Sequence, residues 1–326
     1  MMEAAAGGSL SAPSSASPTA FGNRVNLQHF VDANKSRLVP PVSNCMLFSG
    51  NHLKVMIVGG PNQRDDFHVE RGEEFFYQLS GQMNLDVMQM GRRMRIPIEE
   101  GSVFVLPAGV PHSPQRYENT IGLVVERTRS ADELDALQWY VPGTNRLLYR
   151  EVFYCADLGT QLKGVIERFV ASEDGQRLTA LPSGWRVEDD DTDAHQSLKP
   201  YPLTEPEPLI HTPLPTPLPE LIAKGWKRGN PYAHLIDSEF VLSVFKGCNK
   251  KEAGTYFPID TPNEVLLLQI SGASEISCGP DNTQNLTTLK TGEAMLLHAP
   301  EGTDRYQVRK KRDCEMIAIY TKKVLP

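Results

Sequence analysis

An internal repeat is the feature that most restricts how this chain can fold. Residues 78–81 (QLSG) recur as residues 269–272 (QISG), 191 positions later. Gly101 and Gly292, each just ahead of an apolar run, are separated by the same 191 positions. Two independent matches at one spacing indicate a duplicated domain. A chain of 326 residues is long enough for two domains that each bury their own core.

Short apolar runs between turn residues predict that both copies are rich in β-strands. From residue 53 to residue 127 such runs alternate with Gly, Pro, Asn and Asp, as in a small antiparallel barrel. Strands resume from Phe240 onward. Residues 131–140 and 160–172 instead carry apolar residues at three- and four-residue steps, which predicts two helices. Residues 199–219 have a proline at nearly every third position, which predicts a linker along the surface.

These patterns divide the chain into four parts. Residues 1–21, rich in Ala, Ser, Gly and Pro, are expected to form a disordered tail. This stretch has no Lys or Arg before residue 21 and no continuous apolar run, so neither a secretory signal nor an Arg-rich transit peptide is expected. Residues 22–181 are predicted to form the first β domain with trailing helices, residues 182–217 the Pro-rich linker, and residues 218–326 the second β domain.

Composition restricts the class of partner and the compartment. The net charge of -7 argues against nucleic acid or an anionic membrane as the main partner. No apolar run approaches the ~20 residues that a membrane span needs. The cysteines are odd in number, far apart and without a CxxC pair, so a thiolate zinc site has no support. Free thiols in a reducing compartment fit them best, and a cytosolic protein is expected: Cys45, Cys155, Cys248, Cys278 and Cys314.

Two spaced motifs in the first copy carry its chemistry. They read Gly60-x5-Asp66-x-His68-x5-Glu74-x6-Gly81 and Gly101-x5-Pro107-x-Gly109-x2-His112-x3-Arg116. Both closely resemble the signature motifs of the cupin family of small jelly-roll barrels. Asp66 stands where many cupins have another histidine, and Arg116 stands where many have asparagine. The resemblance implies a mainly β bicupin fold, with two jelly-roll barrels joined by a helical and Pro-rich linker.

The motifs bring together three side chains that can bind a metal: His68, Glu74 and His112. Side chains alternate between the faces of a strand, so His68 and Glu74 can both point inward if a tight turn joins them. Each histidine alone is more often a structural residue, but all three positions meet the cupin spacing at once. Two imidazoles and a carboxylate form the facial triad of non-haem iron(II) oxygenases. The remaining coordination positions would suit dioxygen and two adjacent donors of an aromatic substrate.

Two acidic residues near these ligands need separate interpretations. Glu73 competes with its neighbour Glu74, but the motif spacing to Gly81 selects Glu74, and strand alternation points Glu73 the other way. Asp66 is either a fourth ligand or an acceptor that orients an imidazole, and the second interpretation is favoured.

Charged residues around the motifs indicate the kind of substrate. Arg64 and Arg116 lie close to the two histidines, and Glu126 lies in the apolar run IGLVVERT. A carboxylate inside an apolar barrel is costly unless a partner or ligand meets it. One interpretation is a structural Arg116–Glu126 pair. The other is a pocket for a small aromatic acid, whose carboxylate a guanidinium binds bidentately.

Three longer segments extend the resemblance to one family of cupins. Residues 61–68 (PNQRDDFH), 73–78 (EEFFYQ) and 107–116 (PAGVPHSPQR) are similar to the 3-hydroxyanthranilate 3,4-dioxygenase family. The likeness is strong over roughly residues 26–180. It is weaker over the second domain, as in the two-barrel form found in animals.

The family resemblance implies roles for residues of the first domain. His68, Glu74 and His112 match the ligands of an Fe(2+) cofactor. Arg64 matches the arginine that meets dioxygen, Arg116 the one that grips the substrate carboxylate, and Glu126 the acid that hydrogen-bonds the substrate. The implied catalytic residues are thus Glu74, Arg64, Arg116 and Glu126, of which Glu74, Arg116 and Glu126 contact the substrate.

The reaction implied by the resemblance is extradiol-type ring cleavage. 3-Hydroxyanthranilate and O2 would give 2-amino-3-carboxymuconate semialdehyde, on the kynurenine route to quinolinate and NAD. The implied partners are the small aromatic substrate and O2, without nucleic acid or membrane, and the enzyme is expected to be a monomer. Another iron-dependent cupin dioxygenase and a non-catalytic cupin binding module are the alternatives.

The second copy lacks the metal-binding side chains. A shift of 191 positions places the counterparts of His68, Glu74, His112 and Arg116 at Ile259, Val265, Thr303 and Gln307. The second domain is therefore expected to have kept its barrel without a metal and to cover the open face of the first.

Overall fold

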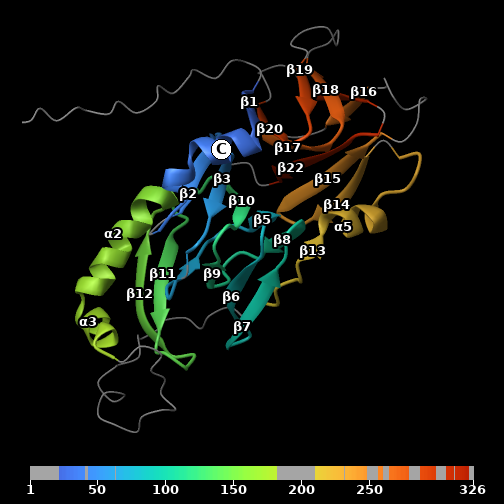
Figure 1. The fold of residues 1–326 in the computed structure, drawn as a ribbon. Helices are drawn as coiled ribbons and strands as arrows, with labels where there is room; N and C mark the ends of the chain where they lie inside the picture. The colour runs from blue at the N-terminus through green and yellow to red at the C-terminus, as the bar shows by residue number, and fades with distance from the viewer. Residues whose placement is uncertain are drawn as a thin grey trace, which may run out of the picture.

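The computed structural model describes most of both halves of the chain (Figure 1). It covers residues 22–40, 43–62, 64–181, 210–230, 232–247, 256–259, 264–278, 287–298, 306–311 and 313–322. The predicted disordered tail, residues 1–21, and residues 182–209 of the predicted linker lie outside the described residues.

The first domain consists of two six-stranded antiparallel sheets with a core between them. One sheet has the order β13-β8-β5-β10-β3-β2, with bounds Thr216–Pro217, Ser102–Leu106, Glu74–Ser80, Ile121–Arg127, Leu53–Gly59 and Asn44–Ser49. The other has the order β12-β11-β4-β9-β6-β7, with bounds Leu147–Phe153, Asp135–Tyr140, Phe67–Val69, His112–Arg116, Met83–Gln89 and Arg92–Ile98. Phe76 and Phe104 of the first sheet pack against Leu85 of the second.

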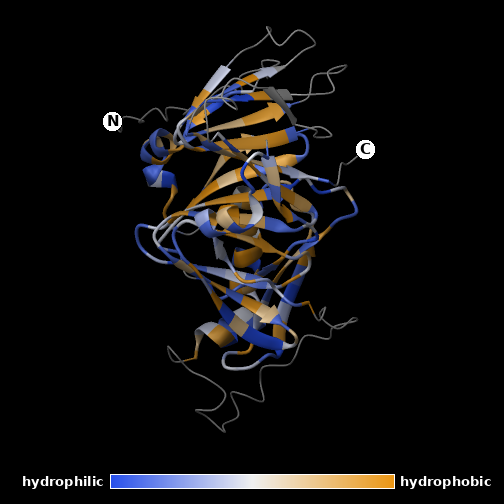
Figure 2. Ribbon diagram, turned by 90° about the vertical axis from the view of Figure 1, so that its right-hand side faces the viewer, coloured by the Kyte–Doolittle hydropathy of each residue, from blue (hydrophilic) through white to orange (hydrophobic). Residues whose placement is uncertain are grey.

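The second domain repeats this architecture with one sheet smaller than the other. Its larger sheet has the order β1-β20-β17-β22-β15-β14, with bounds Arg24–Asn26, Glu293–His298, Glu264–Ser271, Glu315–Thr321, Phe240–Lys246 and Tyr232–Asp237. Its smaller sheet has the order β16-β21-β18-β19, with bounds Tyr256–Ile259, Tyr306–Lys310, Ala273–Cys278 and Thr287–Lys290. The predicted mainly β fold with two barrels is thus confirmed, and Figure 2 shows hydrophobic residues concentrated along the strands of both domains.

The repeated residues form the same turn in both domains. Gly81 and Gly272 both have φ +66°, and Gly101 and Gly292 both have φ +78°, values that favour glycine. The backbone N–H of Gly101 donates to the Gln78 carbonyl at 2.8 Å, and that of Gly292 donates to the Gln269 carbonyl at 2.9 Å. The sequence repeat therefore marks a structural repeat, as domain duplication predicts.

The two domains exchange their first strands. Strand β1, which precedes helix α1 (Leu27–Ala33), pairs with β20 of the second domain. Strand β13, which precedes helix α5 (Leu218–Gly225), pairs with β8 of the first domain. An apolar cluster then joins the facing sheets and contains Val55, Phe75 and Leu242. Strand β5 is consequently covered on both faces, since Phe76 lies in the barrel core and Phe75 lies between the domains.

The helical expectations were half right. The helix expected at residues 160–172 is confirmed: residues 160–171 lie in α2 (Leu158–Ala171), and Ser172 is the N-cap of the next helix, α3 (Glu173–Thr179). A helix at residues 131–140 is wrong, because Asp135–Tyr140 forms strand β11. Every residue of β11 is buried, which removes the polar–apolar alternation that marks a strand in sequence. Helix α2 covers this strand, and Trp139 stacks on Phe169 with ring centroids 3.9 Å apart.

One short 3-10 helix, η1 (Lys35–Arg37), follows α1. Over the described ranges, no helix has the length and apolar character needed to cross a membrane.

Candidate metal centre

Three buried side chains converge inside the first barrel: His68 from β4, Glu74 from the start of β5 and His112 from the start of β9. His68 and His112 lie directly opposite each other in the β4–β9 pair, with ring centroids 5.3 Å apart. Glu74 Oε1 lies 2.9 Å from His112 Nε2 and 3.8 Å from His68 Nδ1. All three ligand atoms are within 4.8 Å of one another, which is compact enough for one metal ion.

The second nitrogen of each imidazole is held by a hydrogen-bond acceptor. His112 Nδ1 donates to the Val110 carbonyl at 3.0 Å, and His68 Nε2 donates to Asp135 Oδ2 at 2.7 Å. Burial alone would raise the pKa of Asp135, but the His68 hydrogen bond and Arg129 lower it, so the group is an ionised acceptor. Both rings therefore carry their proton on the outer nitrogen and turn a lone pair toward Glu74. This is the arrangement in which histidine binds metals.

Asp66 does not have the role favoured from the sequence. Its carboxylate accepts from Arg64 Nε at 3.0 Å and also pairs with Arg64 Nη2. Asp135, whose strand pairs with β4, occupies the predicted place beside His68 instead. The sequence expectation missed Asp135 because it lay in the segment assigned to a helix. The signal that could have found it is the position of Asp135 as the first residue of a buried strand, which is where a polar side chain can enter a site.

The central carboxylate lacks a proton donor of its own. Glu74 Oε1 is buried and makes no hydrogen bond to any described residue, although His112 Nε2 is 2.9 Å away. Burial would raise the pKa of Glu74, but His112, His68 and Arg129 bring it down to about 2. An anionic oxygen and two imidazole nitrogens thus lie close together and buried. A divalent cation bound by all three would satisfy this set, so these residues fit a metal ion.

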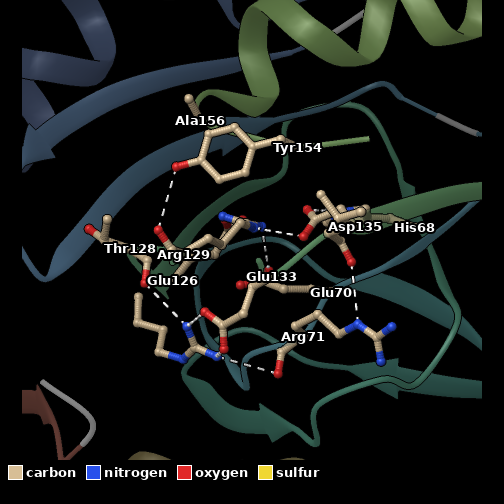
Figure 3. Close-up of polar contacts among 12 residues, drawn as sticks. His68, Glu70, Arg71, Glu126, Thr128, Arg129, Glu133, Asp135, Tyr154 and Ala156 are labelled. Atoms are coloured by element: carbon tan, nitrogen blue, oxygen red, sulfur yellow. Dashed lines mark hydrogen bonds and ion pairs between the residues drawn. The ribbon is translucent and has the colours of Figure 1, made fainter. Parts of the chain in front are cut away.

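A second buried cluster surrounds Arg129. Its guanidinium contacts the carboxylates of Glu70, Glu126 and Asp135 at 3.0, 3.0 and 2.8 Å (Figure 3). These carboxylates raise the pKa of Arg129 despite its burial. With Glu74 nearby, four carboxyl groups surround this one guanidinium, and a divalent cation would offset the negative charge that they carry when ionised. Sequence reasoning missed Arg129 and Glu70, because neither residue occupies a specified position of the two motifs.

Glu126 does not pair with Arg116, so that structural interpretation is wrong. Glu126 Oε2 pairs with Arg129, while its Oε1 is buried without a hydrogen bond to any described residue. Burial raises the pKa of Glu126 to about 7, with Glu74 and Asp135 adding to the rise and Arg129 opposing it. Glu126 lies directly opposite Glu74 in the β5–β10 pair, so its free oxygen belongs to the same site.

Arg116 is a buried cation without a carboxylate partner among the described residues. It is 4% exposed, and its Nη1 lies 2.9 Å from the Met83 sulfur. Burial lowers the pKa of Arg116 to about 10, although Glu74 opposes the change. An unpaired guanidinium in a buried pocket is costly, and a bound anion would remove that cost.

These groups line one pocket that has both polar and apolar side chains. Its charged and imidazole groups are the three converging side chains with Arg64, Arg116 and Glu126. Its apolar side chains include Met56, Val58, Phe76, Val124, Leu158 and Leu162. The structure thus brings all six sequence-predicted site residues to one place. A flat molecule with a carboxylate would meet both apolar contacts and a guanidinium in this pocket.

Residues 20–170 match the family model described as 3-hydroxyanthranilic acid dioxygenase. This N-terminal region belongs to that family. The 3-hydroxyanthranilate 3,4-dioxygenase of Bos taurus is 50% identical over 149 residues, which are 46% of this chain and 52% of the bovine protein. The protein of that name from Homo sapiens is 49% identical over 150 residues, again 46% and 52% of the two chains. The chain thus matches about half the length of these relatives.

Two solved structures resemble the chain over both domains at low identity. A Cupin 2 conserved barrel domain protein from Leptotrichia buccalis has a TM-score of 0.49 and 10% identity, over 93% of this chain and 97% of that one. Oxalate decarboxylase from Bacillus subtilis has a TM-score of 0.47 and 14% identity, over 85% and 71% of the two chains.

All six site residues lie in the region that belongs to the 3-hydroxyanthranilic acid dioxygenase family, and the second domain lies outside it. At the position of Glu74 the second domain has Val265, which is fully buried in its apolar core. The described part of that domain contains no cluster of potential metal ligands. Thr303 and the side chains of Ile259 and Gln307 lie outside the described residues, so a metal-free second domain stays a prediction.

Proposed function

We propose that the chain is a non-haem iron(II) 3-hydroxyanthranilate 3,4-dioxygenase. The observation that carries this proposal is the unpaired, buried Arg116 in the pocket of His68, Glu74 and His112. A metal-binding triad alone would suit many cupins, but a triad facing a lone guanidinium suits an aromatic acid. The names of the bovine and human relatives agree with this substrate.

The protein residues have separate tasks in this reaction. Arg116 binds the substrate carboxylate and so fixes the ring over the triad. Glu126 Oε1 accepts the hydroxyl proton of the substrate, because its pKa of about 7 lets it take and return a proton near neutral pH. Arg64 lines the same pocket and is assigned to meet dioxygen there. Phe76 and Val124 keep water away from the ring.

Iron held by His68, Glu74 and His112 would supply the redox chemistry and positions for two adjacent substrate donors. The proposed ring opening between C3 and C4 incorporates both atoms of dioxygen, so no further co-substrate is required. The product is 2-amino-3-carboxymuconate semialdehyde.

A single anaerobic experiment tests the function. Purified protein loaded with iron(II) is mixed with 3-hydroxyanthranilate without air, and then dioxygen is admitted. We expect loss of the substrate absorbance with uptake of one dioxygen per ring. Iron-loaded protein that leaves 3-hydroxyanthranilate unchanged would contradict the proposal.

We further propose that the enzyme acts as a monomer in the cytosol. Cys45, Cys155 and Cys314 are buried free thiols, as expected in a reducing compartment. An apolar cluster between the facing sheets buries the apolar faces of the two domains against each other. A second copy of the chain is therefore not needed to cover these faces, which supports the monomer.

A further inference from the structure

A carboxylate from the second domain reaches two strands of the metal centre. Glu239 lies in the turn between β14 and β15, whereas both of its partners belong to the first domain. Its Oε2 accepts from the backbone N–H of Glu73 at 2.9 Å, and its Oε1 accepts from Arg127 Nε at 2.5 Å. Glu73 precedes the candidate metal ligand Glu74, and Arg127 follows the candidate substrate residue Glu126.

The two anchored positions lie side by side. Glu74 and Glu126 are direct partners in the β5–β10 pair, so Glu239 spans the ends of both strands one residue from each functional side chain. Gly72 is pressed against the Arg127 guanidinium, and a Cβ there would lie 3.1 Å from Nε. The turn between the strands of His68 and Glu74 is therefore packed on the group that Glu239 holds.

Arg127 extends the connection to a third position. Its guanidinium, 1% exposed, donates to both oxygens of Glu133 at 2.6 Å. Glu133 Oε2 also accepts from the Ser130 backbone N–H at 2.9 Å, which fixes the loop between Arg129 and Asp135. The segment that carries the His68 partner is thus tied to the same buried arginine.

The contact between the domains is reciprocal at this point. Glu73 Oε2 accepts from Ser238 Oγ at 2.6 Å and from the Phe240 backbone N–H at 3.0 Å. The Glu239 turn is therefore locked against the start of β5 from both sides, and its carboxylate has little freedom to move away.

The repeat provides a matched contact that lacks a metal centre. Glu264, 191 positions after Glu73, accepts from the backbone N–H groups of Asn51, His52 and Leu53 at 2.6, 2.9 and 2.9 Å. This contact also joins the two domains, but its bonds go to the first residue of β3 and the turn before it, which carry none of the three converging ligands.

We propose that Glu239 is a positioning residue through which the second domain holds Glu74 and Glu126 in place. The inference rests on the proposed function, because it assumes that these side chains serve a metal and a substrate. It gives the second domain a task besides covering an apolar face. Without Glu239, the Glu73 N–H and Arg127 Nε each lose their acceptor, and the start of β5 loses its contact with the neighbouring domain.

Cobalt(II) binding to the full-length, metal-free protein tests this inference without using turnover. The variants are Glu239→Ala and the isosteric Glu239→Gln, with Glu264→Gln as the matched control. Removing a group that hydrogen-bonds a metal ligand directly weakens metal affinity by about 10–100-fold. Glu239 acts one residue away from Glu74, so we expect Glu239→Ala to raise the Kd for cobalt by about tenfold, the low end of this range. Its visible cobalt spectrum should also change. Glu239→Gln should change both in the same direction and remains available if the alanine variant fails to fold.

Glu264→Gln should leave the cobalt Kd and spectrum close to those of the wild type while lowering Tm. Equal weakening by Glu264→Gln would mean that general loosening between the domains is responsible, and it would overturn the inference. Unchanged cobalt binding in the folded Glu239 variants would also overturn it. Wild-type protein that binds no cobalt would instead overturn the proposed metal centre, and the inference with it.

Discussion

His68 donates from Nε2 to the Asp135 carboxylate across 2.7 Å, between residues that are 67 positions apart in the chain. Both side chains are buried, and Asp135 also accepts from Arg129 Nε at 2.8 Å. One carboxylate thus sets the tautomer of a candidate metal-binding imidazole and joins it to the charge cluster around Glu126. The ring of His68 is oriented by this contact and not by Asp66.

Asp135→Asn should weaken metal binding by about 10–100-fold, the usual effect of removing a carboxylate that orients a metal-binding histidine. The amide keeps the shape of the side chain but loses the charge that fixes the tautomer. Isothermal titration of metal-free protein with cobalt(II) measures this change. Asp66→Asn is the control, because Asp66 contacts Arg64 instead. A larger loss of affinity in Asp66→Asn than in Asp135→Asn would reverse the assignment.

The protein should bind one catalytic iron per chain, since the described residues bring three such ligands together only in the first domain. His68→Ala, Glu74→Ala and His112→Ala should each remove iron and turnover while far-UV circular dichroism stays like that of the wild type. Elemental analysis after gel filtration measures the stoichiometry. Two tightly held irons per chain, both lost on chelation, would contradict a metal-free second domain.

Glu73→Gln and Glu74→Gln should have opposite phenotypes although the residues are neighbours. Glu74→Gln should remove iron and activity, because Glu74 faces the two imidazoles. Glu73→Gln should keep activity within a few-fold and lower the free energy of unfolding by about 0.5–1.5 kcal/mol, since it weakens hydrogen bonds to Ser238 and Phe240. Steady-state kinetics and urea unfolding distinguish the two. Loss of activity in Glu73→Gln alone would place the strand one residue out of register.

Arg116→Met should weaken substrate binding without weakening the fold. A charge-assisted contact contributes about 1.5–3 kcal/mol, or roughly ten- to a hundred-fold in affinity. Removing an unpaired buried cation should leave the free energy of unfolding of the metal-free protein unchanged or higher. Binding of 2-aminophenol, which lacks the carboxylate, should change little. Equal losses for 2-aminophenol and 3-hydroxyanthranilate would assign Arg116 to a role other than binding the carboxylate.

Glu264 should make the fold sensitive to acid. Burial raises its pKa, but His298 and the backbone N–H groups of Asn51, His52 and Leu53 lower it below the ordinary 4.5. A lowered folded-state pKa adds stability above the unfolded value, and this stability is lost as pH falls through the folded value. The difference in unfolding free energy between wild type and Glu264→Gln should therefore be constant near neutral pH and shrink below pH 4.5. A difference that grows on acidification would contradict this sign.

Local spacing was enough to predict which side chains converge in the first barrel. His68, Glu74 and His112 are separated by short turns, so strand alternation and turn geometry already limit where their side chains can point. Gly81 and Gly272 likewise indicate the positions of their turns, because each turn needs a positive φ, which glycine adopts more easily than other residues. Arg116 was predicted to lie in the site for the same reason, being the last residue of the strand that His112 begins.

The partners of these ligands were decided by tertiary structure. Asp135 reaches His68 because β11 pairs with β4, and Arg129 takes Glu126 in place of the expected Arg116. Glu239 reaches Glu73 from 166 positions away, through the packing of two domains. Strand pairing and domain packing follow from the burial of apolar faces over the whole chain, and β11, buried throughout, no longer shows in its sequence which structure it forms. The sequence alone therefore determined which side chains converge on the candidate metal centre, while the fold determined which side chains hold them in place.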